Sequence, residues 1–301
     1  MITENTSQSN EQPTTQAISP PANPLSQFMR HTEIYISLPS QGYYNDENDI
    51  ELTPNGELGV APMTTGDDLE LKSPEGLLNG EAIGRVISSC CPGVKNVYNL
   101  TVPDLDVILL AIRQASYGDI MDFEVTCPEC SHEGIYKLSI SETLLHVGLL
   151  EPEYSLKLSS DVTVFLKPFT YANSVKESMQ KYKEAQTMRL LIDEDLSQDV
   201  KKAAQFSSSL KTLTDLMTQL YSDSIVKILD PSGEEMQVTR EQIHEWMKFL
   251  PRKDAELIQD ELAKINSMGV PKKKLMTCSE CDHSWENDIN FDPSNFFDLS
   301  S

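Results

Sequence analysis

Apolar and polar residues alternate in the first part of the chain, which predicts short β-strands. Residues 34–38 place Ile, Ile and Leu at every second position, and the Leu-Pro-Ser-Gln-Gly run at 38–42 ends the alternation. The same pattern predicts strands around residues 50–52 and 58–60, with a Pro-Asn-Gly turn at 54–56 between them. We therefore expect a small β-structure at the start of the fold.

Helical spacing replaces this alternation in the next segment. Apolar residues at i, i+3, i+4 and i+7 predict a short helix from about residue 79 to Cys90. A second helix begins at Thr101 with a cap, an early proline and an acid. Residues 105–112 are apolar on most of the helix circumference, so this helix should lie at the centre of the core. Cys90 and Cys91 are expected to be packed thiols rather than ligands.

Residues 151–270 have a different pattern, in which helices dominate. A hairpin is predicted at residues 154–166 and a short strand at 225–229. We interpret this part of the chain as a mostly α-helical insertion. Its helices are predicted at residues 170–191, 201–221, 239–249 and 254–268.

A seven-residue motif, T-C-x-E-C-x-H, occurs twice, at residues 126–132 and 277–283. Alternating apolar residues flank each copy, which predicts a β-hairpin with C-x-x-C at its turn. C-x-x-C holds two thiolates about 4 Å apart, the length of one edge of a tetrahedral zinc site. Because two copies supply a complete set of four ligands, we predict one structural zinc site. Its ligands are Cys127, Cys130, Cys278 and Cys281.

This prediction makes the two hairpins the halves of one zinc ribbon, split by the insertion. The metal would connect the middle of the chain to its end, and the loop-closure entropy that this costs grows only logarithmically with loop length. Zinc binding of about 10 kcal/mol or more can offset that cost. A closed four-thiolate shell has no open position for catalysis, and His132 and His283 are expected to flank the shell rather than complete it.

Three other interpretations compete with zinc: disulfides, a redox motif and coincidence. A redox C-x-x-C usually opens a helix, and neither copy is followed by helical periodicity. Disulfides need an oxidising compartment, for which the sequence has no targeting signal. The doubled spacing favours zinc. The sequence leaves open whether one chain supplies all four cysteines or whether zinc joins two chains in a homo-oligomer.

The charge of the chain bears on its partners. The 301 residues include 47 acidic and 24 basic side chains, a formal net charge of −23, which argues against binding to nucleic acid or to an anionic membrane. The acidity fits either solubility or an electropositive protein partner. The lysine run at 272–274 is better explained by local charge balance beside four thiolates, or by solvation, than by a contact with nucleic acid. Neither a membrane span nor a signal peptide is apparent, so a cytoplasmic location is expected.

Together these features predict an α+β protein in four parts. Residues 1–27 are rich in Ser, Thr, Gln, Asn and Pro and are expected to form a disordered arm. Residues 28–150 form a β-rich N-terminal region with short helices and the first zinc hairpin. Residues 151–270 hold a hairpin and the helical insertion, and residues 271–301 hold the second zinc hairpin and a C-terminal tail.

The usual catalytic motifs are absent from the sequence. G-x-x-x-x-G-K-[ST] and G-x-G-x-x-G, which bind phosphates and dinucleotides, do not occur. His244 and Glu245 begin like the zinc-protease motif H-E-x-x-H, but Lys248 stands where the second histidine is needed. The five histidines show no cluster. The sequence therefore predicts a non-enzymatic protein.

Several elements occur in a fixed order along the chain: the turn at 38–42, Met-Thr at 63–64, the helices at 77–90 and 105–112, and the hairpin at 127–130. This order resembles a known family, the baseplate hub assembly proteins of contractile-tailed, T-even-type bacteriophages. The resemblance covers residues 30–140 and extends more loosely to the second C-x-x-C. It implies a non-enzymatic protein of virion morphogenesis that works with hub, spike or tape-measure proteins.

Two functional hypotheses arise from these observations. The first is a structural or chaperone-like assembly protein of a phage tail baseplate hub, made in the host cytoplasm and either retained in the virion or released. The alternative is a zinc-ribbon adaptor that acts on a transcription or other nucleic-acid machine, which a basic, aromatic-rich face near the metal would favour. The ribbon and the lysine run suit the alternative, but the net acidity opposes it.

Overall fold

A computed structural model describes residues 25, 29–193, 211–212 and 214–289. The arm predicted at residues 1–27 lies outside the described residues apart from Leu25, as do the first part of the helix predicted at 201–221 and the C-terminal tail from residue 290. Contacts between Cα atoms separate residues 1–30 from residues 31–301, and the second of these units contains both cysteine motifs.

The first two strands form a small antiparallel pair. Strand β1 (Ile34–Ser37) lies beside β2 (Glu57–Val60), with Ile36 opposite Leu58. The prediction of a strand around residues 50–52 is wrong, because Ile50 makes only an isolated β-bridge, to Val94. Residues 49–51 pair with the loop after the third helix instead, so their alternating pattern comes from packing against a loop.

Four helices follow. They are α1 (Thr65–Leu71), α2 (Pro74–Leu78), α3 (Glu81–Cys90) and α4 (Val102–Tyr117), with a 3-10 turn at Val97–Asn99 before α4. A threonine or serine side chain caps α1, α2 and α4, and α3 begins after a glycine. Thr101 caps α4 by accepting a hydrogen bond from the backbone N–H of Asp104 at 3.2 Å. Side chains of β1, β2, α3 and α4 form a hydrophobic core, the first core. Helix α4 is at its centre, as predicted, because every side chain from Val107 to Ile112 is buried.

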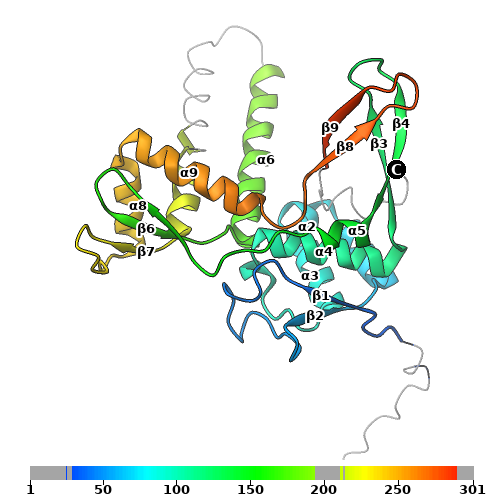
Figure 1. Cartoon of the computed structure of the whole chain (residues 1–301), viewed down its shortest axis with the longest axis horizontal. Coiled ribbons are helices and arrows are strands. Elements are labelled where there is room, and N and C mark those ends of the chain that lie inside the picture. The colour runs from blue at the N-terminus through cyan, green and yellow to red at the C-terminus, as the bar shows by residue number, and fades with distance from the viewer. Residues whose placement is uncertain (1–24, 26–28, 194–210, 213, 290–301) are drawn as a thin grey trace, which may run out of the picture. The chain divides into compact units, whose positions relative to one another are not determined.

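The two cysteine motifs lie on antiparallel hairpins, as the alternation predicted. The first hairpin pairs β3 (Ile120–Thr126) with β4 (Glu133–Ser139), and short helix α5 (Ile140–Leu145) follows it. The second pairs β8 (Lys273–Thr277) with β9 (Ser284–Asp288). Figure 1 shows that the two hairpins, far apart in sequence, are neighbours in the fold.

The segment between the hairpins has its own core. Strands β5 (Tyr154–Lys157), β6 (Thr163–Leu166) and β7 (Ile225–Leu229) form an antiparallel sheet in that order. Helices α8 (Arg240–Phe249) and α9 (Arg252–Ser267) pack on this sheet, with Ile258 and Ile265 fully buried. Helix α6 (Tyr171–Asp193) and the helical residues 214–223 connect β6 to β7. No helix within the described ranges is both long and apolar enough to cross a membrane.

The two ends of this segment meet beside α4. The backbone N–H of Gly148 donates to the carbonyl of Gly269 at 2.9 Å, and that of Leu150 donates to Pro39 at 2.8 Å. Gly269 has a φ of +91°, and a Cβ at this position would lie 3.0 Å from Pro103 Cβ in the first turn of α4. The chain therefore returns to the first core just before the second cysteine hairpin begins.

A buried carboxylate joins α9 to the β5–β6 turn and gives a pH-dependent prediction. Asp254 accepts hydrogen bonds from the Ser159 hydroxyl at 2.6 Å and from the Ser159 backbone N–H at 2.9 Å, and these bonds lower the pKa of the carboxyl. Because the folded pKa is below the unfolded one, the stabilisation is complete at neutral pH and is lost as the pH falls through the folded pKa. Asp254→Asn should thus lower the urea midpoint at pH 7, with a smaller difference from wild type at pH 3.

The control for this prediction is Asp260→Asn, which changes an exposed carboxylate on the same helix. It should leave the urea midpoint close to that of the wild type at both pH values. Equal midpoints for wild type and Asp254→Asn at pH 7 would contradict the assignment of a stabilising role to the Ser159 bonds.

Candidate metal centre

Each cysteine motif closes its hairpin with the same pair of backbone hydrogen bonds. In the first copy the N–H of Cys127 donates to the carbonyl of His132 at 2.8 Å, and the N–H of Ser131 donates to the carbonyl of Cys127 at 3.0 Å. The second copy repeats both bonds at the equivalent positions, at 2.9 and 3.1 Å. The repeated sequence therefore specifies a repeated local structure.

The residue after the second cysteine of each motif has a left-handed backbone. Ser131 has a φ of 57° and Asp282 a φ of 56°. This conformation reverses the chain within the turn and returns it to the second strand, so that both thiols of a motif project from the same turn. A small or carboxylate-bearing residue tolerates the conformation better than a β-branched one.

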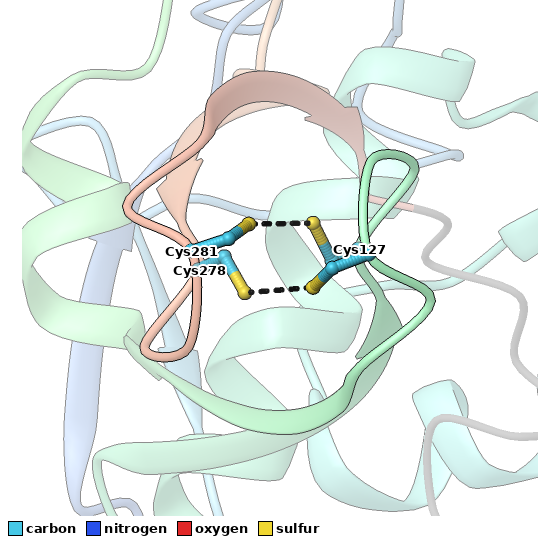
Figure 2. Close-up of side chains that lie close together, drawn as sticks. Cys127, Cys278 and Cys281 are labelled. Atoms are coloured by element: carbon cyan, nitrogen blue, oxygen red, sulfur yellow. Dashed lines mark hydrogen bonds between the residues drawn. The ribbon is translucent and has the colours of Figure 1, made fainter.

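The four sulfur atoms converge from the two hairpins, as Figure 2 shows. The Sγ atoms of Cys127 and Cys281 are 3.8 Å apart, and those of Cys130 and Cys278 are 3.6 Å apart. All four lie within 4.8 Å of one another. Tetrahedral ligands at a Zn–S distance of about 2.3 Å are separated by about 3.8 Å, so the spacing matches what such a metal requires. The four residues could therefore hold one metal ion without rearrangement of the chain.

Burial and charge are unevenly distributed over the cluster. Cys127 and Cys278 are buried, whereas Cys130 and Cys281 are exposed. The backbone N–H of Glu280 lies 3.4 Å from the Cys278 sulfur and lowers the pKa of that thiol to about 7. The His283 amide lowers the pKa of the Cys281 thiol, but desolvation and the neighbouring thiols outweigh it, and this pKa is raised to about 12. Four thiols this close can all ionise only with a cation among them.

Aromatic rings fill the space between the hairpins below the cluster. Trp285 on β9 meets Tyr136 on β4 edge to face, with ring centroids 6.0 Å apart, and it stacks on His283 at 6.0 Å. Gly134 follows its motif histidine by two residues, as Trp285 does in the second copy. A Cβ at Gly134 would lie 3.1 Å from the ring of Tyr136, so the glycine leaves room for the ring that meets Trp285.

His132 and His283 follow the second cysteine of each motif by two residues. Within the part of the chain that the structure describes, the group that could hold a metal ion consists of the four cysteines. His132 Nε2 lies 3.5 Å from the Ser279 hydroxyl on the opposite turn, which adds a second link between the turns.

An ion pair that the sequence pattern did not predict connects the start of the second hairpin to α4. Lys272, immediately before β8, lies 3.1 Å from the carboxylate of Asp106 on α4. Burial raises the pKa of Asp106 and the ammonium of Lys272 opposes that effect. The signal that could have revealed it is an acid, Asp106, between the apolar residues Leu105 and Val107 of α4. Lys273 lies 3.8 Å from Glu286, so two lysines of the run face carboxylates rather than thiolates.

The left-handed turn gives a prediction for the metal site. Ser131→Val should strain the turn by about 1–2 kcal/mol, because a β-branched residue disfavours this backbone, and should weaken metal affinity about tenfold. Ser131→Gly is the matched control and should bind metal at least as tightly as the wild type. Competition with a chromophoric chelator measures both. Equal affinities for Val and Gly at this position would show that the turn does not position the thiols.

Comparison with known proteins places the chain in a family. The family model described as T4 bacteriophage base plate protein matches residues 48–298, which include both cysteine hairpins and the segment between them. Neither the curated proteins nor the solved structures include a match. The match extends far beyond the region 30–140 on which the sequence resemblance mainly rests. The chain belongs to the family of T4 bacteriophage base plate proteins.

Proposed function

We propose that this chain is a non-enzymatic structural or assembly protein of the baseplate hub of a contractile phage tail, stabilised by one structural zinc ion. The observation that carries the proposal is the family match over residues 48–298, which indicates a baseplate protein. The hub location and the assembly role follow from the more specific resemblance in the first part of the chain. The four-cysteine geometry supports the zinc.

In this proposal zinc acts as a structural clasp within one chain. Cys127, Cys130, Cys278 and Cys281 would each supply one thiolate. Thiolates are soft ligands that bind zinc in preference to calcium or magnesium, and four thiolates complete a tetrahedral shell. The clasp would join β3–β4 to β8–β9 and so hold the ends of the intervening segment against the first core. Its role is to fix a surface that other proteins recognise.

The proposed partners are the hub, spike or tape-measure proteins of the same phage. A chain with a net charge of −23 associates most readily with electropositive protein surfaces and is repelled by nucleic acid. This charge favours the baseplate role over the zinc-ribbon adaptor. Assembly would take place in the host cytoplasm, and the protein would be found in the virion tail if it is retained.

Co-expression with the hub, spike and tape-measure proteins of the same phage tests the proposal. We expect a stable complex with at least one of them in size-exclusion chromatography with mass detection, and no shift of labelled DNA or RNA at low salt. Mass spectrometry of purified virions then distinguishes a retained component from a released assembly factor. Absence of any complex, or tight nucleic-acid binding, would overturn the proposed role.

A further inference from the structure

Each cysteine hairpin has an inner face, where the two hairpins meet, and an outer face (Figure 1). The aromatic contact between the hairpins marks the inner faces, and successive side chains of a strand point to opposite faces. On the outer face of the first hairpin, Ile135 therefore stands opposite Glu124, and on that of the second, Leu275 stands opposite Glu286. Ile135 is 67 % exposed and Leu275 is 68 % exposed. Each outer face thus sets a large, exposed aliphatic side chain against a glutamate.

The first hairpin adds further residues to this shared pair. Ile120 lies four residues before Glu124 on the same strand, hence on the same face, and is 52 % exposed. Glu133 also lies on this face, whereas Ser284 holds the equivalent position of the second hairpin. The two hairpins therefore share a framework but differ in their outer faces. The exposed apolar and charged residues on the outer face of the first hairpin are Ile120, Asp122, Glu124, Glu133, Ile135 and Lys137.

The charges on the two outer faces also differ. On the second hairpin, Lys273 lies 3.8 Å from Glu286 and balances its charge. On the first, the ion pairs formed among the described residues include neither Glu124 nor Glu133. Carboxylates without a cation beside exposed isoleucines form a surface that complements a basic, partly apolar partner. Such a partner would supply cations to the carboxylates and would remove the isoleucine side chains from water.

We propose that the outer face of the first hairpin is the docking surface for a positively charged segment of another baseplate protein. The segment places an apolar side chain against Ile135 and lysine or arginine side chains against Glu124 and Glu133. This inference rests on the proposed function and makes it more specific, because it names the surface that the zinc clasp holds in place. Two members of the clasp, Cys127 and Cys130, lie at the turn of the same hairpin.

Ile135→Thr tests the apolar part of the surface. Threonine keeps the β-branched shape that suits a strand but removes much of the apolar area. In the complex formed with the hub, spike or tape-measure protein of the same phage, this variant should raise the Kd at least about tenfold. Leu275→Thr is the matched control, because Leu275 has the same exposure and also faces a glutamate, and it should bind as the wild type does. Biolayer interferometry measures both, at equal zinc content.

Charge reversal tests the acidic part of the surface. Glu124→Lys combined with Glu133→Lys should slow association with the same partner at least about tenfold at low salt, and the effect should shrink as the salt concentration rises. Glu245→Lys combined with Asp260→Lys is the matched control. It changes the net charge by the same amount at exposed positions of α8 and α9, and it should slow association far less.

The outcomes separate this inference from the proposed function. If the wild type forms a complex and both variants of the first hairpin bind equally well, this inference is overturned and the proposed function stands. If the wild type forms no complex with any of these proteins, the proposed function is overturned, and this inference with it. Native mass of the chain alone tests a different occupant: a homodimer that Ile135→Thr dissociates would show that a second copy, and not a basic partner, covers the face.

Discussion

Replacing Cys278 with serine is expected to lower the zinc affinity by at least about 100-fold, since a four-thiolate zinc site contributes about 10–16 kcal/mol in all and serine is a poor ligand. Cys278 is buried and its sulfur lies 3.6 Å from that of Cys130 on the opposite hairpin, so the substitution removes a central member of the cluster. The variant should emerge from purification with far less than one zinc per chain, as measured by elemental analysis together with native mass.

The loss of metal should also separate the hairpins. Apart from the cluster, they are joined by the contact of Trp285 with Tyr136, which is of the order of 1 kcal/mol, and by the contact of His132 with Ser279. We expect amide exchange to rise by at least about tenfold across β3–β4 and β8–β9 and the unfolding midpoint to fall, while the three-stranded sheet keeps its protection. Treating the wild-type protein with a chelator should reproduce the same pattern, with a stability loss that depends on the free zinc concentration.

The control is Cys91→Ala. Cys91 is fully buried in the first core, so this variant should lose some packing energy but keep its zinc. One zinc per chain in both variants would show that Cys278 is not a ligand. Zinc bound at one per chain only in dimers would place the cysteines of two chains around the metal and make oligomerisation part of the function.

The local elements could be predicted from the sequence because their causes are local. The cysteine hairpins, the α4 cap at Thr101 and the α8 cap at Thr239 all depend on residues a few positions apart. The doubled motif also predicted which four cysteines come together, because a metal site needs a complete ligand set. Neither hairpin alone supplies a complete set of four ligands.

Features that depend on distant partners could not be predicted in the same way. Residues 50–52 have strand-like alternation, but the loop at Val94 competes for their backbone and leaves a single bridge. The pairing of Asp106 with Lys272 and the meeting of Tyr136 with Trp285 join segments that only the folded chain brings together. In each case the residue type was visible in the sequence and its partner was not.

Gly80→Ala is expected to destabilise the fold by about 2–4 kcal/mol through the contact between α6 and the first core. Gly80 has a φ of +75°, and a Cβ there would lie 2.4 Å from Val175 Cγ2 and 2.8 Å from the Tyr171 hydroxyl. That hydroxyl also donates to the Gly80 carbonyl at 2.9 Å. The left-handed backbone costs an alanine about 1 kcal/mol, and moving two packed side chains of α6 costs about 1–3 kcal/mol more.

Gly56→Ala separates these two causes. Gly56 has nearly the same φ, +78°, but a Cβ there would meet nothing within 4 Å. It should therefore show the backbone cost alone, and the difference in unfolding free energy between the variants measures the packing of α6 against the start of α3. Urea unfolding at equal zinc loading gives both values. Equal losses in the two variants would mean that α6 moves away at little cost, and the helical segment would then have to be held to the first core by its two ends beside α4.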